Sequence, residues 1–144
     1  MRHITGSCHC ANVRFELVMP LDDAPIPVRA CGCSFCAKHR GAWTSHPEGR
    51  LKAHIADRGE VGLYRFGHGT ADFYICRRCG VAPFVVSETE ANGERRQRAV
   101  VNVNCFDNVP PGDLVVAATD FEHETVEERL SRRGRNWIAD VSID

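Results

Sequence analysis

The sequence predicts a small, mainly β domain held together by cysteine-rich turns, and three observations lead to this prediction. The chain has 144 residues with apolar and charged shares of 43% and 26%, which is the size and composition of one globular domain. Apolar residues alternate with polar ones over many short segments separated by glycine and proline. Most of the eight cysteines lie in three short clusters between such segments. We therefore expect one domain over residues 1–144.

In the first half of the chain, residues 12–18 alternate apolar and polar side chains as a half-buried strand does. A proline-containing loop follows, and a short strand is expected at 28–30. A helical turn is predicted at 35–39, with Ser34 as its cap and Gly41 just after its end. Further strands are predicted at 42–45, 51–54 and 61–66.

In the second half, the strand at 61–66 is expected to pair with 71–75 through a turn that contains Gly67 and Gly69. Strands at 83–87 and 98–104 are expected to pair across a polar loop at 88–96. A helix is predicted at 124–132, and a last strand at 136–143.

Three cysteine clusters carry the chemical signal: Cys8-His9-Cys10, Cys31-Gly32-Cys33-Ser34-Phe35-Cys36 and Cys76-Arg77-Arg78-Cys79-Gly80. Cys-x-x-Cys followed by glycine is typical of a zinc knuckle, because the turn brings both sulfurs to one ion. Zinc in structural sites takes four ligands, and a Cys-x-Cys pair such as Cys8 and Cys10 can complete the set. Distant pairs can meet because the entropy of loop closure grows slowly with loop length.

The remaining cysteines, Cys31, Cys33 and Cys36, form a compact set of three. Three protein ligands with one open position are the pattern of a catalytic zinc, whereas structural sites are closed. The sequence therefore predicts two zinc ions per chain and seven cysteine ligands. An open position can bind water or an incoming thiol and stabilise its deprotonated form.

Spacing alone leaves alternatives open. Cys33 and Cys36 could instead pair with Cys76 and Cys79 in a zinc ribbon, or the cysteines could be unligated core or redox thiols. His39 could close the second site as a fourth ligand.

The composition disfavours several other classes of protein. The formal net charge of -1 gives no field that attracts nucleic acid. The longest apolar run, residues 114–118, is far shorter than the roughly 20 residues of a membrane helix. The first ten residues lack the apolar segment of a signal peptide, so we expect a cytoplasmic protein with reduced thiols. An edge strand in so small a sheet needs covering, and a second copy of the chain in a homodimer could cover it.

Longer stretches around the clusters carry a family resemblance. They are Gly6-Ser7-Cys8-His9-Cys10-Ala11-Asn12-Val13-Arg14-Phe15, the second cluster with Gly41-Ala42, Tyr64-Arg65-Phe66-Gly67, the third cluster, Asn102-Val103-Asn104-Cys105-Phe106-Asp107 and Gly134-Arg135-Asn136-Trp137. In their order and spacing the chain resembles the glutathione-dependent formaldehyde-activating family, which also includes centromere protein V.

This resemblance implies a β-tent fold, two short antiparallel sheets with one or two short helices, held by zinc. It implies a structural zinc ion and a second, active-site ion at the catalytic residues Cys31, Cys33 and Cys36. The structural ligands would be Cys8, Cys10, Cys76 and Cys79. The implied activity is that of a carbon–sulfur lyase that forms S-hydroxymethylglutathione from glutathione and formaldehyde. The family's centromere branch suggests the alternative, a non-catalytic zinc module that binds protein partners.

Other residues are weaker candidates. Phe35, Trp43 and Trp137 could line a substrate pocket, although aromatic residues in a small β domain belong to the core more often. Arginines could form an anion-binding patch, but acidic neighbours favour a solvated face; these are Arg95, Arg96, Arg98, Arg129, Arg132, Arg133 and Arg135. Cys105 is interpreted as a core residue.

Overall fold

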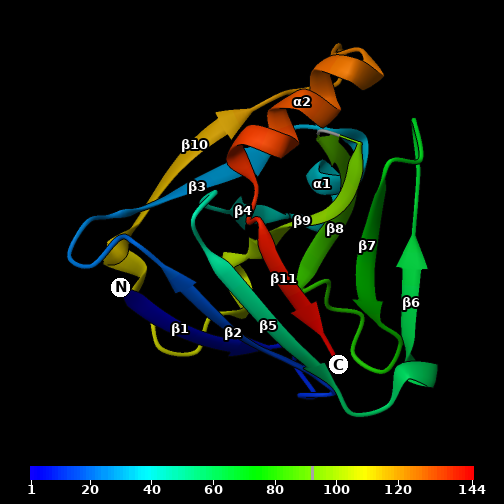
Figure 1. The fold of residues 1–144 in the computed structure, drawn as a ribbon. Helices are drawn as coiled ribbons and strands as arrows, with labels where there is room; N and C mark the ends of the chain where they lie inside the picture. Colours follow the sequence, from blue (N-terminus) through cyan, green and yellow to red (C-terminus); the bar gives the residue numbers. More distant parts are fainter. Residues whose placement is uncertain (92) are drawn as a thin grey trace.

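The computed structural model describes residues 1–91 and 93–144, and in these residues the fold is mainly β, as predicted. Two sheets pack against each other, and two α-helices lie beside the larger sheet (Figure 1). The smaller sheet has four strands in the order β1 (Arg2–Ser7), β2 (Val13–Met19), β5 (Arg50–Ile55) and β11 (Asp140–Ile143). The described helices are all too short to span a lipid bilayer.

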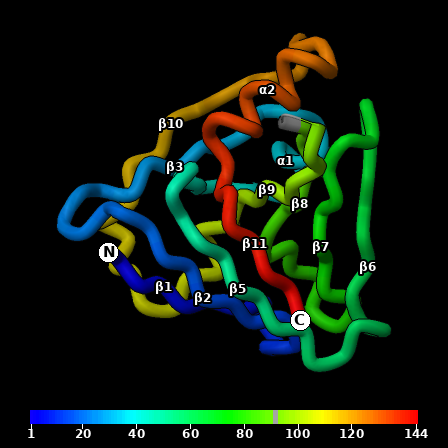
Figure 2. Tube along the Cα trace, in the orientation of Figure 1, coloured from blue at the N-terminus to red at the C-terminus, as the bar shows by residue number. Residues whose placement is uncertain are grey.

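The larger sheet has seven strands. Their order is β10 (Leu114–Thr119), β3 (Ile26–Cys31), β4 (Ala42–Thr44), β9 (Glu94–Asn102), β8 (Phe84–Ala91), β7 (Ala71–Cys76) and β6 (Val61–Tyr64). Strand pairing is antiparallel except at one pair in each sheet, where β10 runs parallel to β3 and β11 runs parallel to β5. The tube in Figure 2 shows how these late segments of the chain return to lie beside early ones.

Both helices differ slightly from their predicted bounds. Helix α1 spans Ser34–His39, and its N-terminal cap is Cys33, whose Sγ accepts a hydrogen bond from the N–H of Cys36. It ends at Arg40, which has a left-handed φ of 59°. Helix α2 spans Val126–Asn136, where the hydroxyl of Thr125 accepts from the N–H of Glu128. Thr125 is a standard N-cap residue, so it fixes the start of α2. Three short 3-10 turns complete the fold, at Arg58–Glu60, Val103–Cys105 and Pro111–Asp113.

Two strands were not predicted, because neither shows the usual alternation. In β1, Gly6 takes an inward position, where an added Cβ would come within 2.3 Å of the Phe15 ring. Phe15 thus replaces the side chain that would have made the alternation visible. In β10, Val115 and Val116 point to opposite faces and are both exposed, so this edge strand beside β3 has no alternation of buried and exposed residues.

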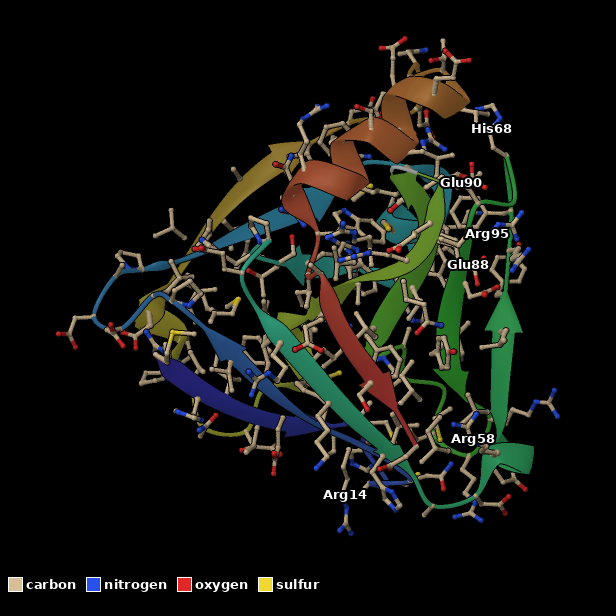
Figure 3. All side chains as sticks on the ribbon, in the orientation of Figure 1. Arg14, Arg58, His68, Glu88, Glu90 and Arg95 are labelled. Carbon is tan, nitrogen blue, oxygen red and sulfur yellow. The ribbon has the colours of Figure 1, made fainter. Side chains whose placement is uncertain are left out.

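The hairpin of β8 and β9 is longer than predicted, because strand pairing continues through most of the expected loop at 88–96. Charged side chains pair across it: Arg95 lies 3.7 Å from Glu88 and 3.4 Å from Glu90 (Figure 3). Gly93 has a φ of 80°, which suits the tip of the turn. Asn92, also in the expected loop, lies outside the described residues.

The middle of the larger sheet, around β8, is buried on both faces, and this positions the site. Phe84 and Val86 of β8 face the smaller sheet and belong to the main core, together with Phe15 and Leu51. Val85, between them in sequence, points to the opposite face. There it joins a second apolar cluster, which consists of Cys36, Trp43, Ala71, Ala82, Val85, Val100 and Trp137.

Candidate functional site

A group of four cysteines connects the two sheets. Cys8 and Cys10 lie in the turn between β1 and β2 of the smaller sheet, whereas Cys76 ends β7 of the larger one and Cys79 follows in the next turn. The four sulfurs lie within 4.8 Å of one another. The separations are 3.8 Å for Cys8 to Cys10 and 3.5 Å for Cys10 to Cys76. Tetrahedral zinc with bonds of about 2.3 Å to sulfur requires S–S separations of about 3.8 Å, so this four-cysteine group could hold zinc.

Backbone groups support the four-cysteine group. The N–H of Val13 donates to Sγ of Cys8 at 3.4 Å. Gly80 has a φ of 78° and donates its N–H to the carbonyl oxygen of Cys76 at 2.8 Å. A glycine is needed here because L-residues rarely adopt this conformation. The knuckle predicted from Cys-x-x-Cys-Gly is therefore a tight turn whose form depends on Gly80.

The second group consists of Cys31 at the end of β3, Cys33 at the cap of α1, and Cys36 within α1. Their sulfurs lie within 4.8 Å of one another, and among the described residues no fourth His, Cys, Asp or Glu completes the set. His39 instead stacks on Phe35, with 5.0 Å between ring centroids. The structure thus groups the cysteines as spacing favoured, and the ribbon pairing of Cys33 and Cys36 with the knuckle is not formed.

Hydrogen bonds tune the sulfurs of this three-cysteine group. Hydrogen bonding with Cys36 lowers the pKa of Cys31 to about 6, which favours a thiolate there at neutral pH. The indole N–H of Trp43 donates to Sγ of Cys36. Burial raises the pKa of Cys33, and the hydrogen bond with Cys31 raises the pKa of Cys36. Three clustered sulfur donors match the ligand preference of zinc, so this group could hold a metal ion as well. Cys105 belongs to neither group; it is buried, and burial raises its pKa to about 12, as expected of a core thiol.

The three-cysteine group forms part of the wall of a pocket whose empty volume is about 770 Å³, including space open to solvent. The apolar part of the wall includes Trp43 and Trp137, for which the sequence favoured a core role, together with Phe66, Phe73 and Phe121. Phe35 is not in the wall; it packs behind Phe73, with 4.7 Å between ring centroids. The two tryptophans therefore serve the apolar cluster and the pocket at once.

Four arginines also line this pocket: Arg29, Arg129, Arg132 and Arg133. The expectation of a solvated face is therefore wrong for Arg129, Arg132 and Arg133 of α2, whereas Arg135 of the same helix is exposed as expected. It holds for Arg95 and Arg96, whose side chains are 74% and 59% exposed. The sequence could not separate the two sets, because the burial of the α2 arginines arises only when this helix packs beside β8. Arg29 was missed altogether, as it looks like an ordinary polar residue in a strand.

Arg133 is the most enclosed of the four, with 8% of its surface exposed. Its Nη1 donates to the hydroxyls of Thr70 and Ser87 at 2.8 and 3.0 Å. Its guanidinium lies over the Trp137 ring, 4.8 Å from the centroid. Burial lowers the pKa of Arg133 to about 10, which leaves the group charged at neutral pH.

The fold and site define a class of cysteine-rich β protein with two potential metal centres. Its features are two packed β-sheets, a four-cysteine group that joins them and a three-cysteine group in the wall of a pocket. A family model described as glutathione-dependent formaldehyde-activating enzyme matches residues 3–123. The chain therefore belongs to this family. Helix α2 and strand β11 lie beyond the matched residues.

A solved structure is also similar: the crystal structure of a Rhodobacter sphaeroides protein from a structural genomics programme. It is 30% identical in sequence with a TM-score of 0.53, and the match covers 80% of this chain and 99% of that one.

Proposed function

We propose that this protein is a zinc-dependent carbon–sulfur lyase acting on a thiol adduct of a small aldehyde, such as S-hydroxymethylglutathione. Cys31, Cys33 and Cys36 hold the active-site zinc, and the four-cysteine group holds a structural zinc. The observation that carries the proposal is the three-cysteine group in a pocket wall, with no His, Cys, Asp or Glu as a fourth ligand among the described residues. The description of the family supports glutathione and formaldehyde as the substrate pair.

In the adduct-forming direction, the substrate thiol loses its proton and its sulfur forms a bond to the aldehyde carbon. The π electron pair of the carbonyl group moves to oxygen, which takes up a proton, so that thiol and aldehyde give a hemithioacetal without any other reactant. The lyase reaction is the reverse. Zinc bound at the three cysteines would supply a Lewis acid that favours the thiolate form of the substrate.

The chain's own residues would prepare the pocket for this chemistry. Trp43, Phe73 and Trp137 give it apolar walls, which limit the access of water to the reacting sulfur. The hydrogen bond from Trp43 fixes Cys36 and withdraws negative charge from its sulfur. A smaller negative charge on the protein sulfurs reduces their electrostatic repulsion of an incoming thiolate.

The test combines zinc stoichiometry with a rate. Native mass spectrometry of the purified chain should give two zinc ions, and exchange NMR at equilibrium should show faster interconversion of glutathione and its hydroxymethyl adduct than in protein-free buffer. Protein-free buffer is the necessary reference, because the adduct also forms without a catalyst. The variant Cys33→Ser should lose the rate effect, whereas Cys105→Ala, outside both cysteine groups, should keep it. Two bound zinc ions with no rate effect would contradict the proposal and favour a non-catalytic module for protein partners.

A further inference from the structure

The arginines of the pocket are not equally neutralised. Arg132 donates from Nε and Nη2 to both carboxylate oxygens of Glu124, at 2.9 Å each. Arg129 lies 3.7 Å from the same carboxylate. For Arg29 and Arg133 no ion pair with a described carboxylate is formed. The polar partners of these two are neutral: Arg29 donates to the hydroxyl of Ser45 at 2.8 Å, and Arg133 donates to Thr70 and Ser87.

Buried charge without a counter-charge is costly and is seldom kept unless a partner or ligand supplies the opposite charge. Arg29 has one such source nearby. It lies two residues before Cys31 on β3, so both side chains point to the same face of the strand. Negative charge on the sulfur of Cys31 would offset the positive charge of Arg29. Arg133, on α2, has only the carboxylate of Glu124 near it, and that single negative charge is already paired with Arg129 and Arg132. Glu122 also lines the pocket and accepts from the N–H of Ser34 at 3.1 Å, so four arginines stand against one carboxylate in the described lining.

Unsatisfied polar atoms gather at the same pocket. Four buried side-chain atoms lack a hydrogen-bond partner in the described part of the chain. Three of them belong to residues that line the pocket: Nε of Arg133, Nε1 of Trp137 and Oγ1 of Thr119. Native proteins leave few such atoms, so their concentration in the side chains around one cavity marks a polar environment that is short of partners.

We infer that this pocket binds a thiol that carries a carboxylate, with the sulfur at the three-cysteine group and the carboxylate at Arg133, assisted by Arg29. The sulfur end of this inference rests on the proposed function, whereas the carboxylate end rests on the arginines alone. A guanidinium suits a carboxylate because its planar fork can donate two parallel hydrogen bonds. Arg133, on α2, lies beyond residues 3–123 matched by the family model, whereas Arg29 lies within them.

The two tryptophans of the chain both line the pocket, so their intrinsic fluorescence can report binding without a label. The zinc-loaded protein is titrated with 3-mercaptopropionate and with 3-mercaptopropionamide, which keeps the thiol but replaces the carboxylate by a neutral group of similar size. We expect at least tenfold tighter binding of the carboxylate. Propionate, which has no thiol, should compete with 3-mercaptopropionate.

Variants locate the effect. Arg133→Gln should abolish the preference for the carboxylate and the competition by propionate. Arg95→Gln, at an exposed arginine outside the pocket, should keep both. If Arg133→Gln does not fold, the ligand comparison on the wild-type protein still decides the matter, and Arg29→Gln should weaken the preference.

The outcomes separate the two proposals. Equal affinity for the two thiols overturns the carboxylate inference and leaves the proposed function standing. If neither thiol binds through its sulfur but propionate binds in an Arg133-dependent way, the anion site stands and the proposed function fails. If none of the three ligands binds, both the carboxylate inference and the proposed function are overturned.

Discussion

The indole N–H of Trp43 donates a hydrogen bond to Sγ of Cys36 over 3.4 Å, from strand β4 to helix α1. Both residues are buried, at 5% and 3% exposure, so this bond is shielded from water. A buried donor that points at a metal-ligating sulfur orients it and moderates its charge. The pair thereby connects the larger sheet to helix α1, which contains Cys36 and is capped by Cys33.

Replacing Trp43 by phenylalanine should therefore weaken zinc binding in the pocket. We expect Trp43→Phe to lower the affinity roughly tenfold to a hundredfold, the range found when an outer partner of a ligand is removed. Competition with a chromophoric chelator measures this affinity. Trp137→Phe is the matched control, because Nε1 of Trp137 lacks a hydrogen-bond partner among the described residues and does not support a sulfur. Equal zinc affinities of the two variants would contradict the role assigned to the Trp43 N–H.

The two cysteine groups should respond differently to loss of one sulfur. Cys79→Ser removes a ligand from the group that joins the sheets, so we expect a large fall in thermal stability and loss of that zinc ion. A structural zinc can contribute on the order of 10 kcal/mol to folding. Cys33→Ser should lose only the pocket zinc, with a much smaller fall in the unfolding temperature. Native mass spectrometry and thermal unfolding measure both quantities, and a similar loss of stability in the two variants would argue against separate structural and active sites.

Gly80 should be sensitive to substitution for a purely conformational reason. A Cβ added at Gly80 would meet no atom within 4 Å, yet the φ of 78° strains any L-residue. We expect Gly80→Ala to lower the free energy of unfolding by about 1–2 kcal/mol, as measured by urea denaturation of the zinc-loaded protein. Gly112→Ala provides the control, since Gly112 also has open space around it but no positive φ. A neutral effect of Gly80→Ala would show that the turn can relax.

Glu124 should give α2 a pH-dependent contribution to stability. Hydrogen bonds from Arg132 lower the pKa of Glu124 below its ordinary value of 4.5, which means that folding favours the ionised carboxylate. The contribution is therefore present above that ordinary value and is lost as the pH falls through the lower pKa of the folded state. Wild type should be more stable than Glu124→Gln near neutral pH, and the difference should shrink on acidification below about 4.5.

Acid also releases metal from thiolates, so the relevant quantity is the difference between wild type and variant at each pH, obtained from paired thermal unfolding curves. Glu48→Gln, at an exposed position without a described ion pair, corrects for the general effect of removing one carboxylate. A difference between wild type and Glu124→Gln that does not change with pH would contradict the assignment.

The sequence by itself determined the features that depend on near neighbours in the chain. The spacing of Cys31, Cys33 and Cys36 brings three sulfurs together within one strand end and one helical turn, so their grouping could be predicted. The hairpin of β6 and β7 could also be predicted, because Gly67 and Gly69 supply positive φ between alternating segments.

Only the tertiary structure decided the features that depend on contacts between distant segments. It brings the turn of Cys8 and Cys10 to the end of β7, which selects the four-cysteine group over a ribbon. It also packs α2 beside β8. As a result, arginines that the sequence placed on the surface line a pocket. Strand and helix periodicity report which face of an element is apolar, but they do not report which element covers it. The charge of Arg133 is therefore visible in the sequence, whereas its burial near the cysteines is not.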